Sequence, residues 1–209
     1  MRVLLTLLIM ALGLSAVPAA SAPRKPYVRE GWVVGVAYGP ARAKIQGSDS
    51  LNTEWLEGPA QSIRLGRLLN PSLMVSYEHQ AWLREQGFQE LKIRAGVQLE
   101  ALGVTAYPGR PGTAWNGLYL TAGGGYAHCR LTFLEPLAPD ESPIGNTYEP
   151  IFTEDEFGWG WYGGLGYEFR ISRSFAAGVL ITYNRVEIGG SIYDNAQFVP
   201  LVASLNWNF

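Results

Sequence analysis

In the segment LVASLNWNF, residues 201–209, two kinds of side chain alternate from one residue to the next. One face carries Leu201, Ala203, Leu205, Trp207 and Phe209, and the other carries Val202, Ser204, Asn206 and Asn208. A period of two predicts a β-strand with two unlike faces. This is the clearest strand in the chain, and the same pattern identifies the others.

Similar alternating segments recur upstream, without a helical periodicity of useful length between them. We predict strands near residues 30–45, 59–69, 72–83, 88–106, 115–132, 156–170, 174–187 and 196–209. Tight turns (69–72, 108–112, 171–173) alternate with a second set of connections (46–58, a short one near 84–87, 133–155 and 188–195), most of which are longer. Strands of ~10 residues joined alternately by short turns and longer loops are typical of membrane barrels. The sequence therefore predicts an all-β fold, an eight-stranded antiparallel up-and-down transmembrane β-barrel.

The amino-terminal segment has the pattern of a secretory signal. Arg2 precedes an apolar run that continues to about Val17, and the small residues Ala20, Ser21 and Ala22 follow it. The run is shorter than the ~20 residues that a membrane-spanning helix needs. We therefore predict a cleaved signal peptide over residues 1–22 and a barrel domain over residues 23–209.

The polar face of the predicted strands carries charges of both signs. Six of them are predicted to form a charge network in the lumen: Arg64, Glu78, Lys92, Arg94, Glu100 and Glu168. Val97 and Leu99 then belong to the opposite, apolar face. A soluble lipocalin-like barrel would enclose the apolar face, whereas a membrane barrel exposes it. Aromatic residues gather at both ends of the strands and the enclosed charges balance, so we favour the membrane barrel.

The carboxyl-terminal strand that ends on Phe209, together with the signal segment, resembles the last strand of bacterial outer-membrane barrels. Gly31–Gly39, Trp115–Tyr126 and Gly158–Phe169 carry the same resemblance. It is a resemblance to the generic outer-membrane β-barrel domain family, the small barrels of the OmpA, OmpX and opacity-protein types. It implies a location in the cell outer membrane and an insertion signal at Phe209, read by the barrel assembly machinery. Outer-membrane lipids and lipopolysaccharide are the other expected partners, and a monomer is favoured.

Few side chains are arranged for catalysis or metal binding. His79 and His128 lack the His-x-Ser spacing of the lipid A deacylase family, and Cys129 has no base partner that can be placed from the sequence. The sequence contains no cluster of Cys and His residues of the kind that binds zinc. The glycines at 123–125 lack the strand–turn–helix setting of a phosphate loop. We therefore predict no catalytic residue, no metal and no cofactor.

The third long connection is acidic from Glu135 to Glu156. Its carboxylates, with no Lys or Arg among them, are Glu135, Asp140, Glu141, Glu149, Glu154, Asp155 and Glu156. We interpret the segment as a solvated external loop. Weak capture of divalent cations by its carboxylate oxygens is the alternative.

The overall charge is mild, with 16 Lys and Arg against 18 Asp and Glu. There is no basic face of the kind that binds nucleic acid. We predict a non-enzymatic integral outer-membrane protein with a structural or surface-interaction role in the cell envelope. A lipid A-modifying enzyme, a narrow channel and a soluble lipocalin-like carrier are the alternatives.

Overall fold

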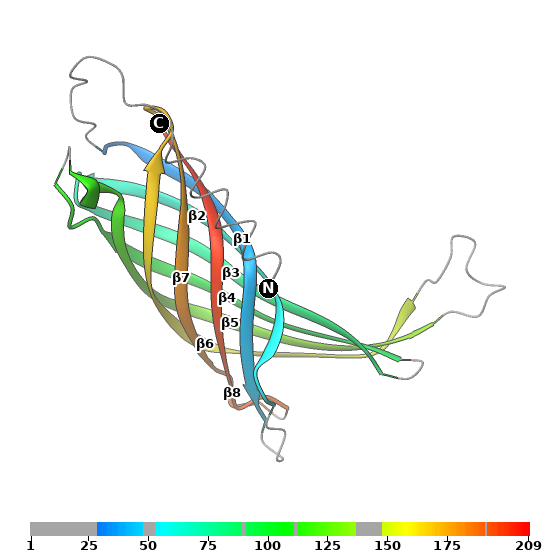
Figure 1. Ribbon diagram of the computed structural model, residues 1–209. Helices are drawn as coiled ribbons and strands as arrows, with labels where there is room; N and C mark the ends of the chain where they lie inside the picture. The colour runs from blue at the N-terminus through cyan, green and yellow to red at the C-terminus, as the bar shows by residue number, and fades with distance from the viewer. Residues whose placement is uncertain (1–28, 48–52, 89–90, 111–112, 137–147, 191) are drawn as a thin grey trace.

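The computed structural model describes residues 29–47, 53–88, 91–110, 113–136, 148–190 and 192–209 (Figure 1). The strands of this part are β1 Trp32–Gln46, β2 Leu56–Asn70, β3 Leu73–Phe88, β4 Leu91–Ala106, β5 Leu118–Pro136, β6 Tyr148–Arg170, β7 Phe175–Glu187 and β8 Asn195–Asn208. A 3-10 turn, η2 Ala114–Gly117, precedes β5. None of the helices in the described part is long and apolar enough to cross a membrane. The signal peptide expected over residues 1–22 lies outside the described residues.

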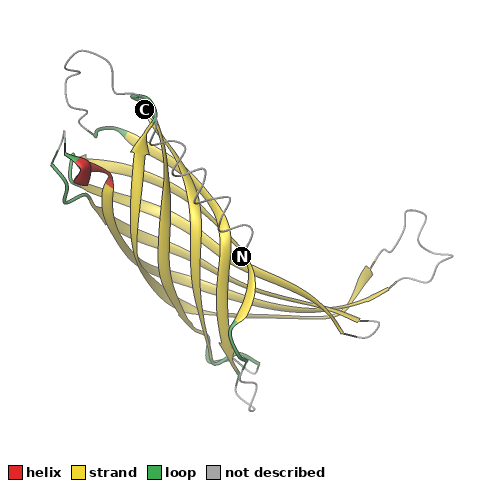
Figure 2. Cartoon of the chain, in the orientation of Figure 1, coloured by secondary structure: helices red, strands yellow, loops and turns green. Residues whose placement is uncertain are grey.

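The strands form one closed ring in sequence order (Figure 2). Each strand pairs antiparallel with the next, and β8 pairs back with β1, where Val34 faces Trp207 and Val36 faces Leu205. Every predicted strand overlaps one observed strand. The structure therefore confirms the eight-stranded antiparallel barrel.

The outside of the barrel is apolar. In the middle of the strands Val36, Ile63 and Leu102 are among the exposed side chains, and Leu102 is 74% exposed. Exposed aromatic rings form two belts, which include Trp32, Trp115, Trp207 and Phe209 at one end and Tyr38, Tyr126, Trp159 and Trp161 at the other. Apolar bands flanked by aromatic belts match the hydrocarbon core and interfaces of a bilayer. The lipocalin-like alternative, with the apolar face inside, is therefore wrong.

Side chains fill the lumen in layers. Apolar residues occupy the end nearest the short turns (the turn end), where Val33, Leu68, Met74, Tyr107, Tyr119, Leu180 and Val202 form a buried cluster. A larger apolar cluster occupies the other half and includes Trp82, Val97, Leu99, Tyr162, Val186, Tyr193 and Phe198. The buried Arg64–Glu78 pair lies between the two clusters.

Glycines make room for the large rings inside. A Cβ at Gly103 would overlap the hydroxyl of Tyr162, one at Gly123 the ring of Tyr162, and one at Gly166 the ring of Tyr119. The interior of an eight-stranded barrel is just wide enough to be filled by side chains. Gly103, Gly123 and Gly166 therefore belong to the inward face.

Strand β4 has the opposite orientation to the predicted one. Val97 and Leu99 are fully buried in the lumen, whereas Gln98 and Glu100 lie on the outer face. The apolar positions of β4 change phase between Leu99 and Leu102, so its sequence fits either face. Val97 and Leu99 face inward because the adjacent half of the lumen is itself apolar.

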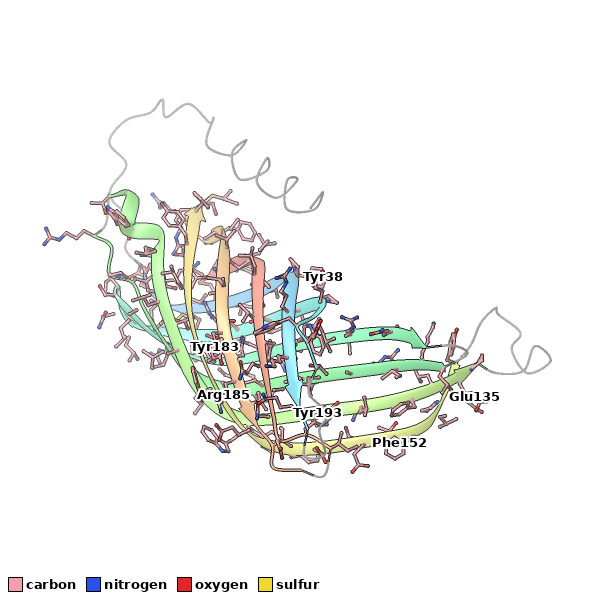
Figure 3. The ribbon with its side chains drawn as sticks, turned by 60° about the horizontal axis from the view of Figure 1, so that its bottom comes forward. Tyr38, Glu135, Phe152, Tyr183, Arg185 and Tyr193 are labelled. Atoms are coloured by element: carbon pink, nitrogen blue, oxygen red, sulfur yellow. The ribbon has the colours of Figure 1, made fainter. Side chains whose placement is uncertain are left out.

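Strands β3 to β6 continue past their neighbours as a four-stranded extension, which we call the arm (Figure 1). It begins at the row in which Leu83 faces Gly96, Gly96 faces Arg130 and Arg130 faces Asp155. Beyond this row, in the described part, β2 no longer pairs with β3 and β7 no longer pairs with β6. In Figure 3 the arm extends away from the barrel, with Glu135 and Phe152 along it.

The arm corrects the interpretation of residues 133–155 as an irregular loop. β5 runs to Pro136 and β6 starts at Tyr148, with a register shift beside Phe133. Phe133 and Phe152 face each other in this acidic segment, and their rings contact each other across the strand pair. Asp140 and Glu141 lie outside the described residues.

Candidate functional site

The first charge pair of the lumen joins β2 and β3. Nε of Arg64 donates a hydrogen bond of 2.9 Å to Oε1 of Glu78, and the Glu78 side chain is completely buried. Ser76 donates to the same carboxylate at 3.0 Å, and Gln80 donates to its other oxygen at 3.3 Å. The guanidinium of Arg64 also lies 5.7 Å from the ring centre of Tyr119. The carboxylate therefore has three donors in a space closed to bulk water.

The second pair lies at the turn end of the lumen. Nε of Arg29 donates to Oε1 of Glu168 at 3.0 Å, with both side chains almost fully buried. Arg29 also donates to the side chain of Asn116 at 2.8 Å and lies 4.1 Å from the ring centre of Tyr107. Arg170 is a second cation beside Glu168, at 3.5 Å. Arg29 thus holds the segment before β1 across the turn end of the barrel.

Sequence reasoning missed Arg29 and misplaced Tyr107. Arg29 precedes the first predicted strand, so alternation could assign it to neither face. The position of Tyr107 just after the fourth predicted strand predicts a ring of the periplasmic aromatic belt, but Tyr107 is only 5% exposed and packs inside the lumen. Tyr107 contacts Arg29 because the segment before β1 crosses the turn end of the barrel. No local sequence pattern indicates the path of that segment.

Half of the predicted lumen network lies elsewhere. Glu100 is on the outer face of the barrel, where Tyr77 and His79 donate to it. Arg94 is half-exposed on the arm and pairs with Glu85 at 2.5 Å. Lys92 lies on the same face of the arm, with its ammonium 3.7 Å from the ring centre of Tyr148. The prediction is wrong for these three residues because all belong to β4, whose two faces are exchanged.

Arg64, Glu78 and Glu168 are the predicted residues that the structure places inside. They form two separate centres, one with each partner arginine, rather than a single network. Polar contacts continue from Glu78 through Gln80 to Thr182 and Asn184 on β7. The polar layer thereby ties β2 and β3 to the opposite wall.

The arm-end opening of the lumen is covered by the connection between β7 and β8. Tyr193 of this connection is buried in the larger apolar cluster. Glu156 on β6 accepts hydrogen bonds from the backbone N–H of Ile192 at 2.8 Å and of Tyr193 at 2.7 Å. The carboxylate of Glu156 therefore fixes this connection against the barrel wall.

Two histidines pair with carboxylates on the outer face. Nδ1 of His79 lies 2.5 Å from Glu100, and Nε2 of His128 lies 2.7 Å from Asp155. Arg130 binds Asp155 through two hydrogen bonds, which lower the pKa of Asp155 and raise that of Arg130. A histidine with an orienting carboxylate can act as a base, but hydrolysis also needs a nucleophile within reach. Among the described residues, no Ser, Thr or Cys is hydrogen-bonded to either histidine.

Cys129 is the cysteine of the chain, and the structure places it away from the two histidine–carboxylate pairs of the outer face. The thiol of Cys129 is buried in the apolar cluster of the lumen. Within the described ranges, no three His, Cys, Asp or Glu side chains are grouped so that they could hold a metal ion.

Comparisons with known proteins agree with this architecture. The family model described as "Outer membrane protein beta-barrel domain" matches residues 4–209. The attachment invasion locus protein Ail of Yersinia pestis, solved with the heparin analogue sucrose octasulfate, superposes with a TM-score of 0.53 at 12% identity, over 86% of this chain and 99% of Ail. Neisserial surface protein A superposes with a TM-score of 0.51 at 15% identity, over 86% of this chain and 97% of that one. No curated protein sequence gives a match.

Proposed function

Since this chain belongs to the outer membrane protein beta-barrel domain family, we propose that it is a sealed, non-enzymatic barrel whose function resides in the arm. Its location is the outer membrane. In barrels of this kind the short turns face the periplasm and the longer connections face the exterior. The turn end is then periplasmic, and the arm stands outside the cell.

The filled lumen is the observation that carries the proposal. The Arg64–Glu78 pair lies between two apolar clusters, and Arg29 with Glu168 occupies the turn end. A conducting pore needs a continuous polar path, which the large apolar cluster interrupts. This supports a sealed barrel over a narrow channel.

The arm supports a role at the cell surface. Eight strands already close the barrel, so the extra length of β3 to β6 adds no wall to it. A sheet outside the membrane offers a rigid surface to molecules that approach the cell. The histidine–carboxylate pairs supply a base without a bonded nucleophile, so they favour a lipid A-modifying enzyme less.

Single-channel recording tests the sealed lumen. We expect folded protein in planar bilayers to give no steady conductance steps, because side chains occupy both halves of the lumen. Insertion should be verified in the same lipid by the altered gel mobility of the unheated barrel. Large, steady currents from verified, folded protein would overturn the proposal.

A further inference from the structure

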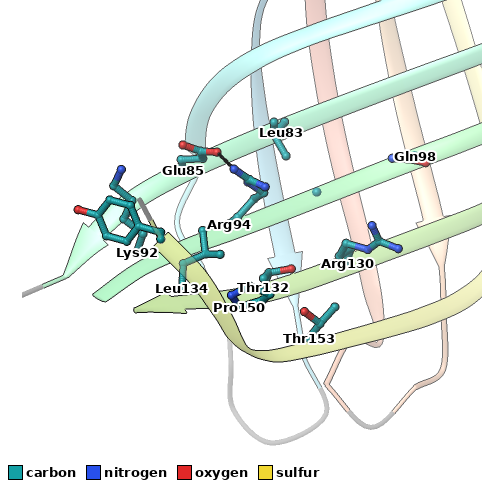
Figure 4. Close-up of a pocket in the computed structure, with 12 residues that line it drawn as sticks. Leu83, Glu85, Lys92, Arg94, Gln98, Arg130, Thr132, Leu134, Pro150 and Thr153 are labelled. Atoms are coloured by element: carbon teal, nitrogen blue, oxygen red, sulfur yellow. Dashed lines mark hydrogen bonds and ion pairs between the residues drawn. The ribbon is translucent and has the colours of Figure 1, made fainter. Parts of the chain in front are cut away.

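The outer face of the arm is hollowed into a trough of about 830 Å³, shown in Figure 4. Its charged lining residues are Lys92, Arg94, Arg130 and Glu85. Tyr148 of β6 borders the trough. The ammonium of Lys92 on β4 reaches across β5 and lies over the ring of Tyr148. Thr132 and Leu134 of β5 are buried at its floor. The sheet is therefore concave on this face, with three cations around the hollow.

The cations are only partly neutralised. Glu85 pairs with Arg94, and Asp155 binds Arg130 from outside the lining of the trough. Lys92 has an aromatic ring, and no carboxylate, as its partner among the described residues. Arg94 and Arg130 have side chains that are 44% and 53% exposed, so their remaining N–H donors can reach a ligand. The hollow favours an anion with several acceptor oxygens.

The trough continues the lipid-facing surface of the barrel. Along the outer face of β4, Leu102 and Val104 are exposed to lipid, Glu100 and Gln98 follow, and Arg94 and Lys92 come last. A lipid lying against β4 and β5 would thus have its acyl chains on the apolar band and its head group beside the cations. The same order of apolar chain and anionic head group occurs in a phosphorylated glycolipid.

From this arrangement we propose that the trough binds the phosphorylated saccharide head group of an outer-leaflet glycolipid of the lipid A type. Arg94 and Arg130 hold the phosphate through their guanidinium groups, and Lys92 adds a third positive charge. Tyr148 lies beside the head group as a flat apolar surface. The proposal does not depend on whether the lumen conducts.

Lipid A retention by the purified barrel tests this site. The full-length protein in detergent is titrated with bisphosphorylated lipid A, and retained lipid is counted by native mass spectrometry. We expect Lys92→Gln/Arg94→Gln/Arg130→Gln to lower the apparent affinity about tenfold or more, since each cation near a membrane surface contributes about 1 kcal/mol. If this variant does not give a folded band in unheated gels, Lys92→Gln alone should still lower the affinity by a few fold.

The matched control removes three cations from the other side of the barrel. Arg42→Gln/Lys44→Gln/Arg185→Gln changes the net charge equally at the external ends of β1 and β7 and should retain lipid A as the parent does. Dephosphorylated lipid A should bind the parent as weakly as the trough variant binds lipid A. Excess inorganic phosphate should not displace the lipid, because it lacks the acyl chains that pack on the barrel. Equal losses in both triple variants, equal binding of dephosphorylated lipid A, or displacement by phosphate alone would each overturn the proposal.

Discussion

Replacing Glu78 by Ala is expected to lower the free energy of unfolding by about 3–5 kcal/mol, the usual cost of removing one partner of a buried ion pair. The Glu78 carboxylate is completely buried and accepts hydrogen bonds from Arg64, Ser76 and Gln80. Without it, the guanidinium of Arg64 stays charged in a space closed to bulk water. Arg64→Ala should cost a similar amount, because it leaves the carboxylate without its counter-ion.

Two further variants separate the buried pair from the charges that lie outside. Arg64→Leu/Glu78→Leu removes both charges and should be clearly more stable than either single alanine variant. Arg94→Ala removes a half-exposed arginine of the arm, and exposed pairs contribute only about 0–1 kcal/mol. Denaturant unfolding in lipid vesicles, followed by tryptophan fluorescence, measures all four. An unchanged midpoint for Glu78→Ala, or an equal loss for Arg94→Ala, would contradict this description of the lumen.

Changing Phe209 to Asp is expected to abolish most assembly of the barrel while leaving export intact. Phe209 is 64% exposed, and its ring touches only that of Trp207 edge-on among the described aromatic residues. Its backbone N–H and C=O bond to Trp32, and a substitution keeps both of these bonds. A large effect of Phe209→Asp would therefore come from recognition of the side chain during assembly rather than from packing in the finished barrel.

The control for Phe209 is another exposed ring at the same end. Phe169→Asp places a carboxylate at the periplasmic end of β6, on a residue that is 49% exposed. Phe209→Tyr keeps an aromatic ring and should assemble normally. The folded fraction in the outer membrane is measured at native expression as the heat-modifiable band. Normal assembly of Phe209→Asp, or an equal defect in Phe169→Asp, would show that Phe209 has no special role in insertion.

The fold could be predicted from the sequence because each strand repeats one simple constraint. Lipid selects apolar side chains on one face, and the narrow lumen selects small or polar ones on the other. This constraint is strong in β8 and β1, where Leu205 and Val36 alternate with Asn206 and Gly35. It also correctly placed Arg64, Glu78 and Glu168 on the inward face.

The same constraint failed where the lumen is apolar. In β4, Val97 and Leu99 face inward against Trp82 and Phe198, so hydrophobicity no longer distinguishes lumen from lipid. The pairing of β4 with β3 fixes its orientation, because His79 faces Glu100 in the register. Such a register is a property of two strands together and cannot be read from β4 alone. The trough was hidden for the same reason, since two of its three cations, Lys92 and Arg94, are predicted by the sequence pattern to lie in the lumen.

The most direct test of the barrel described here is to ask which methyl groups touch lipid. In nanodiscs, magnetisation transfer from lipid acyl-chain protons should reach the methyl groups of Ile63, Leu102 and Val104, which lie on the outer face. It should not reach those of Val97, Leu99 and Val202, which are buried in the lumen. Strong transfer to Val97 and Leu99, with none to Leu102 and Val104, would contradict the orientation of β4 and with it the filled, sealed lumen.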